Sequence, residues 1–354
     1  MAAAADPAEG SFASKGARAL AFASSFTVCL LAAGALAVTL LGRPHGSFIR
    51  LDLRDAIAPK ASQAASETVP AAMADGPSMA PVTKPLYAGK ALLADPALVQ
   101  NVALGPLPRI ADDGRKPMTA YAGPAAAADK KFRIAIVVNG LGMSAPATKA
   151  ALDGLPSAVT LGFEPYAGDV SQWVSEARAK GHEVLLEIPM EPFDFPESDP
   201  GPHTLRAGQD QDANVLRLNW ALSRFTGYAG VTNLLGQRLL TDADALSPVL
   251  TSLNRRGLYF FDNGAAAQSV VPTVASQLGM PAAENGAAVD SIQTAPEIDR
   301  RLSELETQAR ANGSAVGSAF LYPVSVTRIA QWARGLESRG FVLVPVSAIV
   351  TQPK

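Results

Sequence analysis

Short apolar segments alternate with helical patterns from residue 132 to the C-terminus, and this alternation constrains the fold more than any other feature. Between the apolar segments, helical faces repeat at three- and four-residue spacing, as in Ile298, Leu302, Leu305 and Ala309. Strands in regular alternation with helices predict an α/β fold with a parallel sheet covered on both faces. Seven or eight such units are enough to close into a (β/α) barrel, so we expect a barrel of seven or eight parallel strands. The expected strands are residues 134–138, 158–163, 183–188, 230–234, 258–262, 315–320 and 341–346, with a weaker candidate at 281–285.

A charge-free segment near the N-terminus predicts a membrane anchor. Residues 19–42 contain no charged side chain and are long enough to cross a bilayer core of about 30 Å as a helix. Polar segments on both sides argue against a buried core helix. The length of the span, with no small-x-small cleavage site after it, argues against a signal peptide. We therefore expect a tail at residues 1–18 and a single transmembrane helix at 19–42. Positive charges on both sides leave the orientation open, with a slight bias toward a cytoplasmic C-terminus.

Residues 43–131 have the composition of a linker. They are rich in Pro, Ala, Ser and Gly, and no window shows a sustained period of helix or strand. Such a segment buries too little apolar surface to offset the entropy of ordering it. We expect a mostly disordered, semi-stiff tether that leads to a barrel domain at 132–350. Residues 91–100 are a candidate docking segment within it.

The composition excludes several classes of function. The net charge of −2 gives no basic surface for nucleic acid. The chain has no glycine-rich phosphate loop and no nucleophile-elbow motif. Its single cysteine, Cys29, lies in the charge-free span, so an intramolecular disulfide cannot form.

Polar side chains follow the predicted strands at their C-terminal ends, where barrel enzymes build their active sites. Because these ends meet on one face, the side chains are candidates for ligand binding. Asn139 is also a plausible turn residue beside Gly140, and Glu191 and Arg238 are equally explained as an ion pair. The candidates are Asn139, Glu187, Glu191, His203, Asn233, Arg238 and Asp262.

Five segments between residues 132 and 350 resemble the divergent polysaccharide deacetylase family. They read RIAIVVNGLG, GHEVLLEIPMEPFDFPESDPGPHTL, GVTNLLGQRL, LYFFDNG and GFVLVPVSAIV. The resemblance implies a deformed (β/α) barrel related to enzymes that remove N-acetyl groups from glycans. It also implies a divalent metal held by one Asp and two His, with a second Asp as general base.

The residues that would perform this chemistry are replaced in this chain. The pair of Asp residues expected after the first strand reads Asn139–Gly140, and Leu234 and Phe320 stand where the resemblance implies histidines. Of the three histidines, His45 lies in the linker and His182 precedes the third strand, so only His203 can reach the catalytic face. We therefore expect no bound cofactor and no functional catalytic residues.

Three functions remain open from the sequence. The first is a barrel in the inner membrane, with its globular domain in the periplasm, that binds envelope glycan or an envelope protein without hydrolysis. The second is an active hydrolase with a rearranged Zn site built from Glu187, Glu191, Asp262 and His203. The third is a scaffold that binds only another envelope protein. For the carboxylates we favour a structural role in which Glu191 pairs with Arg238 and Asp262 caps a turn.

Overall fold

The structure is a computed structural model and describes residues 95–124 and 132–350. The predicted tail, the transmembrane helix at 19–42 and the first part of the linker lie outside the described residues. Among the helices that are described, none combines the length and the apolarity needed to cross a membrane. The membrane anchor therefore stays a prediction from the sequence.

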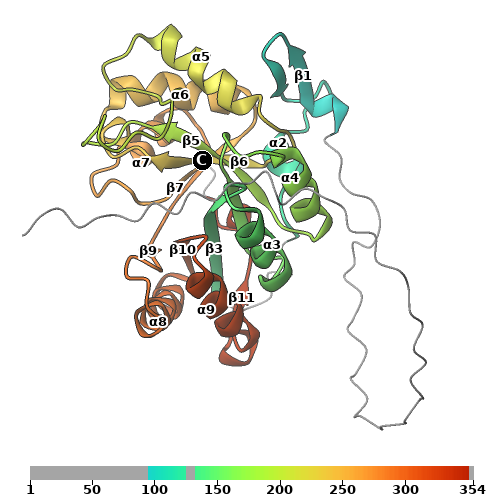
Figure 1. Ribbon diagram of the computed structural model, residues 1–354, viewed down its shortest axis with the longest axis vertical. Coiled ribbons are helices and arrows are strands. Elements are labelled where there is room, and N and C mark those ends of the chain that lie inside the picture. The colour runs from blue at the N-terminus through green and yellow to red at the C-terminus, as the bar shows by residue number, and fades with distance from the viewer. Residues whose placement is uncertain (1–94, 125–131, 351–354) are drawn as a thin grey trace, which may run out of the picture. The chain divides into compact units, whose positions relative to one another are not determined.

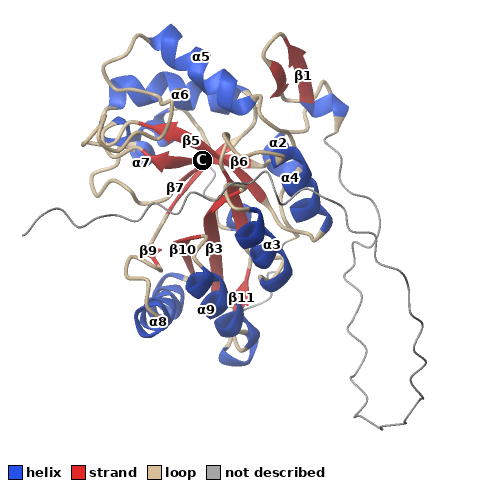
Figure 2. Ribbon diagram, in the orientation of Figure 1, coloured by secondary structure: helices blue, strands red, loops and turns tan. Residues whose placement is uncertain are grey.

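A nine-stranded sheet forms the centre of the domain, and every pairing within it is parallel (Figures 1 and 2). All eight predicted strands are confirmed, and one short strand, β9, was not predicted. The strands run in the order β8-β7-β6-β5-β4-β3-β10-β9, with β11 paired to β3. Their bounds are β3 Phe132–Leu141, β4 Thr160–Phe163, β5 Val184–Met190, β6 Gly230–Leu235, β7 Tyr259–Asp262, β8 Ala282–Glu284, β9 Ala287–Ala288, β10 Ser314–Phe320 and β11 Phe341–Leu343.

Helices follow most of these strands and cover the outside of the sheet (Figure 2). Local signals set their ends. The Ser144 side chain caps α3, the Asp242 side chain caps α6, and Gly313 ends α8 in the left-handed conformation at φ 80°. The apolar face expected on the longest helix is buried as predicted. The helices are α3 Ala145–Gly154, α4 Val170–Ala179, α5 Gln211–Leu222, α6 Ala243–Arg255, α7 Val271–Gln277, α8 Ala295–Asn312 and α9 Pro323–Arg334.

One short connection joins the two edges of the sheet. The edge strands β8 and β9 are separated in the chain only by Asn285 and Gly286. The N–H of Asn285 donates to the carbonyl of Asp262 on β7, and the N–H of Gly286 donates to the carbonyl of Val316 on β10, both at 2.8 Å. This connection leads from one edge strand to the other and holds the sheet in a curled shape. Among the described residues β8 and β9 do not pair with each other, and the sheet has nine strands where seven or eight were expected, so it is a deformed barrel that remains open.

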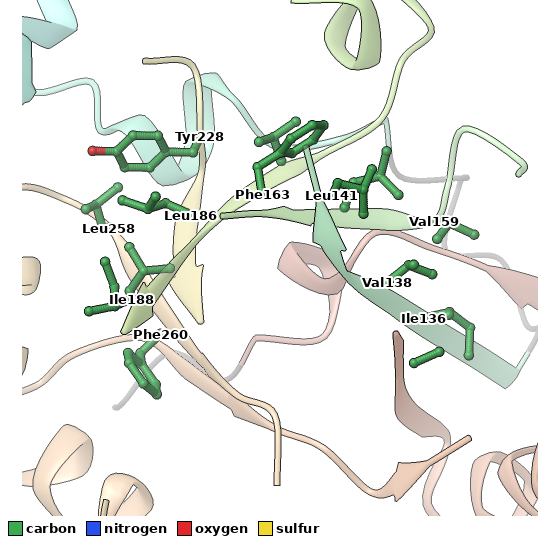
Figure 3. Close-up of a cluster of buried hydrophobic side chains, with 14 of the residues drawn as sticks. Ile136, Val138, Leu141, Val159, Phe163, Leu186, Ile188, Tyr228, Leu258 and Phe260 are labelled. Atoms are coloured by element: carbon green, nitrogen blue, oxygen red, sulfur yellow. The ribbon is translucent and has the colours of Figure 1, made fainter. Parts of the chain in front are cut away.

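Apolar side chains cover both faces of the curled sheet. Figure 3 shows the cluster that includes Ile136, Val138 and Leu186, which the surrounding helices pack against. The alternate residues Ala135, Val137 and others form a separate cluster inside the barrel. Burial on both faces agrees with the unbroken apolar runs of the sequence. Since side chains alternate along a strand, Asn139 belongs to the same inner row as residues 135 and 137.

Residues 95–124 are ordered and pack on the barrel, so the prediction of a mostly disordered linker is wrong for this part. They form a short 3₁₀ turn, η2 (Pro96–Leu98), a hairpin of β1 (Val99–Val102) and β2 (Gly105–Pro108), and the helical turn α2 (Pro117–Ala120). Leu98, Met118 and Tyr121 are buried in the inner apolar cluster. These anchoring residues are too widely spaced to produce a recognisable period in the sequence.

A buried carboxylate, Glu183, ties the termini of the domain to the sheet. Its oxygens accept hydrogen bonds from the Gly123 N–H at 2.9 Å, the Tyr259 hydroxyl at 2.9 Å and the Ser347 N–H at 3.1 Å. The neighbouring His182 ring lies 2.9 Å from the Val159 carbonyl. His182 is thus buried at the N-terminal end of the strands, as predicted, and takes no part in the opposite face.

We expect Leu98→Ala to lower the free energy of unfolding by about 2–4 kcal/mol, because Leu98 fills the inner apolar cluster and its removal leaves a cavity. Val102→Ala, at an exposed position of the same hairpin, serves as the control and should cost less than about 1 kcal/mol. Urea denaturation followed by circular dichroism measures both. Equal effects of the two substitutions would show that the hairpin segment adds nothing to the core.

Candidate functional site

Three polar side chains meet inside the C-terminal end of the barrel. Asn139 comes from β3, Glu187 from β5 and Thr232 from β6, where Glu187 and Thr232 are direct neighbours in register. On β4, between Asn139 and Glu187, stands Gly162. A Cβ atom placed at Gly162 would overlap the Asn139 Oδ1 atom and lie 3.0 Å from Glu187 Oε1. The two side chains therefore converge over this glycine, and we call the three residues the mouth cluster.

Several polar atoms of the mouth cluster lack a partner. The Gly140 N–H donates to Glu187 Oε1 at 2.6 Å. The second carboxyl oxygen of Glu187, Asn139 Oδ1 and Thr232 Oγ1 are all buried with no hydrogen-bond partner among the described residues. Buried polar atoms are nearly always paired, and an unpaired one costs about 1–3 kcal/mol. The cluster is therefore a place where water or a ligand group would be stabilised.

Burial raises the pKa of Glu187 to about 8. The nearby carboxyl group of Glu164 raises it further, and the hydrogen bond from the Gly140 N–H opposes the shift. Burial also raises the pKa of Glu164 itself. At neutral pH, Glu187 is consequently mostly an uncharged carboxylic acid that can both donate and accept hydrogen bonds.

Glu191 and Arg238 form an ion pair, as the sequence interpretation proposed. Glu191 Oε1 lies 3.5 Å from an Arg238 guanidinium nitrogen, and its other oxygen accepts the Ala207 N–H at 2.7 Å. The side chain of Glu191 is almost fully buried, whereas that of Arg238 is half exposed. The pair holds the loop after β5 in place, so the Glu191 carboxylate has a structural role.

Asp262 and Asn233 also serve the local backbone. Asp262 Oδ1 accepts the Gly264 N–H at 2.9 Å, which confirms that Asp262 caps a turn. The Asn233 amide exchanges hydrogen bonds with Asn263 and donates to the Leu235 carbonyl. Asn285 extends this amide network to Ser318 on β10 at 2.7 Å. The network holds together the ends of four strands, so the Asn233 amide is engaged in structure, and one oxygen of Asp262 is engaged in its turn.

His203 lies in an aromatic cluster beside α5. Its ring stacks on Trp220 with centroids 3.5 Å apart and an angle of 1° between the planes. The backbone N–H of His203 donates a hydrogen bond to the Tyr166 hydroxyl at 2.9 Å. Burial lowers the pKa of His203, and the charges of Arg224 and Arg217 lower it further. His203 is thus a neutral, stacked side chain, and Trp220 packs against the hydrophobic core between the sheet and the helices.

The two positions where the resemblance implies histidines offer no ligand atom. Leu234 stands next to Pro189 in the β5–β6 register, and Phe320 stands next to Asn139 in the β3–β10 register. The Phe320 side chain is 40% exposed. The Phe320 ring lies 6.2 Å from the Tyr322 ring, and further exposed apolar side chains follow the C-terminal ends of β3, β5 and β9. We call the whole set the apolar rim: Met143, Phe193, Ile292, Phe320 and Tyr322.

The divalent metal that the resemblance implies does not fit these residues. Gly140 has no side chain, Asn139 contributes only a neutral amide, and Glu187 Oε1 already accepts a backbone N–H. A carboxyl group with a pKa of about 8 is also a poor ligand at neutral pH, because it is mostly protonated. Within residues 95–124 and 132–350, no three His, Cys, Asp or Glu side chains are grouped to hold a metal ion.

Sequence reasoning missed Thr232 and Gly162. Strand alternation contained the signal, since Thr232 lies one residue before Asn233 and so on the opposite face of β6. Choosing between the two faces required the register that sets Thr232 beside Glu187.

The curled parallel sheet is the fold of a deformed (β/α) barrel, and comparison with known proteins identifies the same class of protein. Residues 136–350 match the model of the family described as divergent polysaccharide deacetylase, and the chain belongs to this family. The solved structure of a protein from Agrobacterium tumefaciens is 41% identical in sequence, with a TM-score of 0.68. The match covers 70% of this chain and 100% of that protein's chain. YibQ of Escherichia coli is 23% identical over 222 residues, 63% of this chain and 68% of YibQ. A Haemophilus influenzae protein is 23% identical over 206 residues, 58% of this chain and 72% of its own length.

We expect the stability of the wild type relative to Glu187→Gln to fall as pH rises. The pKa of Glu187 is about 8 in the folded state against an ordinary value of 4.5, so the folded state binds the proton more tightly. The difference in unfolding free energy should therefore decline by up to about 1.4 kcal/mol per pH unit across this window and level off above it. Urea titrations at several pH values measure it. The exposed Glu197→Gln variant is the control, and a flat difference for Glu187→Gln would contradict the raised pKa.

Proposed function

We propose that this protein is a glycan-binding member of its family that does not hydrolyse its ligand. One observation carries the proposal: Asn139 Oδ1, Glu187 Oε2 and Thr232 Oγ1 are buried at the barrel mouth without a hydrogen-bond partner among the described residues. Such atoms gain most from a ligand that supplies the missing hydrogen bonds.

The chemistry of the mouth cluster suits an uncharged, hydroxylated ligand. An amide, a hydroxyl and a neutral carboxylic acid each donate and accept hydrogen bonds, as sugar hydroxyl and acetamido groups do. The apolar rim around the cluster, with the rings of Phe193, Phe320 and Tyr322, supports this proposal. Sites for small ligands commonly combine such apolar walls with a few convergent polar groups.

The same residues argue against hydrolysis. An amide at Asn139 cannot remove a proton from water, and Gly140 cannot hold a metal. The rearranged metal site that the sequence left open requires Glu191 and Asp262, but these carboxylates bind Ala207 with Arg238 and Gly264, respectively.

We further propose that the chain is a single-pass inner-membrane protein whose barrel lies in the periplasm. The charge-free span at residues 19–42 supports the anchor, and the location of envelope glycans supports the orientation. An envelope protein is the second candidate ligand. The apolar rim supports it, because clustered exposed apolar side chains are common at protein interfaces.

Isothermal titration with chitooligosaccharides and peptidoglycan fragments tests the glycan proposal. We expect binding by the wild type and an affinity about tenfold lower for Asn139→Ala, which removes a hydrogen-bonding group from the mouth cluster. Asn312→Ala, at an exposed position at the end of α8, is the matched control and should bind as the wild type does. No binding at millimolar ligand would exclude a glycan and favour the protein partner.

Metal analysis and a deacetylase assay with added Zn²⁺, Mn²⁺ or Ni²⁺ test the absence of hydrolysis. We expect neither stoichiometric metal in the purified protein nor turnover of acetylated glycan above the rate without protein, because no base and no set of ligands is in place. Turnover that a chelator abolishes would instead support the hydrolase, and an Asp262→Ala variant would then show whether that carboxylate takes part.

A further inference from the structure

A second hollow lies on the outer, helical side of the domain, away from the barrel mouth. It is about 560 Å³ in volume and is bounded by α5, α6 and the β1–β2 hairpin. This size is within the range of small-molecule sites. The ordered segment 95–124 supplies one of its walls, so the hollow exists only because that segment packs on the barrel.

Positive charge is concentrated in this hollow. Three arginines line it, Arg109, Arg255 and Arg256, and no Asp or Glu in the described part of the chain is among its lining residues. A chain of net charge −2 thus presents a local cationic site here. Arginine is suited to oxyanions because its planar group donates two parallel hydrogen bonds to a phosphate or a carboxylate.

The three arginines differ in how firmly they are held. Arg256 donates to the Pro108 carbonyl at 3.0 Å and to the Asn219 side chain at 3.1 Å, so it is a fixed part of the wall. Arg109 pairs with Asp112, whose side chain is 94% exposed, and such surface pairs contribute little. The exposed Arg255 forms no ion pair and no side-chain hydrogen bond with any residue that the structure describes. Arg255 is therefore the guanidinium group free to bind a ligand.

Hydroxyl and amide groups surround the arginines. Ser247, Thr251 and Ser252 face the hollow from α6, and none of their hydroxyls hydrogen-bonds to another described side chain or carbonyl. Gln100 and Gln211 add amide groups from the hairpin and from α5. Such groups complement the hydroxyls of a ligand, whereas the arginines complement its negative charge.

From this combination we propose that the hollow between α5, α6 and the hairpin binds a small hydroxylated oxyanion, such as a sugar phosphate or a sugar acid. Arg255 makes the ion pair, Arg256 provides fixed positive charge, and the α6 hydroxyls bind the hydroxyl groups of the ligand. The site is independent of the mouth cluster, because it uses none of the same residues.

The chain contains a matched control for Arg255. Arg334 occupies the last turn of α9, as Arg255 occupies the last turn of α6, and it is also exposed. Arg334 lines a different hollow between α3 and α9, whose walls include Ala147, Ala150 and Val326. The two arginines share their residue type and their place at a helix end but differ in surroundings. A difference in ligand affinity between their variants can therefore be attributed to the hollow beside Arg255.

Calorimetric titration of the full-length chain with glucose 6-phosphate, glucuronate and glucose tests the proposal. We expect at least one of the two anions to bind in the millimolar range or tighter and glucose not to bind, with affinity falling as salt is added. Arg255→Gln should weaken binding about tenfold, whereas Arg334→Gln should leave it unchanged. Binding of only one anion would identify phosphate or carboxylate as the recognised group.

Three results would overturn the proposal. These are no binding of either anion at millimolar concentration in low salt, equal affinities of the Arg255→Gln and Arg334→Gln variants, and glucose binding as tightly as the anions. Thermal unfolding of Arg255→Gln checks that the variant is folded. Arg109→Gln provides a second variant on the opposite wall and should weaken binding in the same direction.

Discussion

The curvature of the sheet, on which the rest of this domain depends, is held by the hydrogen bonds of Asn285 and Gly286. The backbone N–H groups of these residues donate to β7 and β10, which are the neighbours of the two edge strands β8 and β9, and so hold the sheet in its curled shape. In a curled parallel sheet the C-terminal strand ends face one another, which brings Asn139, Glu187 and Thr232 together from three strands. The amide network from Asn233 to Ser318 strengthens the same closure.

Burial then decides the chemistry at the barrel mouth. Glu187 has one backbone hydrogen bond and a neighbouring carboxyl group, and no cation contributes to its pKa, so it remains protonated at neutral pH. A site with a neutral acid, an amide and a hydroxyl is suited to hydrogen-bonding an uncharged molecule. The glycan-binding role that we propose for the barrel mouth rests on this uncharged chemistry.

The two surfaces proposed as binding sites are chemically distinct. The barrel mouth is uncharged and has an apolar rim, whereas the hollow beside α5 and α6 is cationic and hydroxylated. The hollow depends on residues 95–124, which extend the folded domain beyond the start of the family match at residue 136. This N-terminal segment therefore contributes to packing and, in our proposal, to the second binding site.

The order of strands and helices and the buried helical faces followed from the sequence, because periodicity is a local property. The turn at Asp262 was predictable from neighbouring residues, and the pairing of Glu191 with Arg238 from opposite charges that follow the ends of the adjacent strands β5 and β6. Tertiary structure alone decided that Thr232 joins Glu187, that Leu98 and Tyr121 anchor the segment before the barrel, and that Arg255 faces a hollow. Each of these depends on register or on packing between distant segments, and the sequence of one segment contains no record of the partner it will meet.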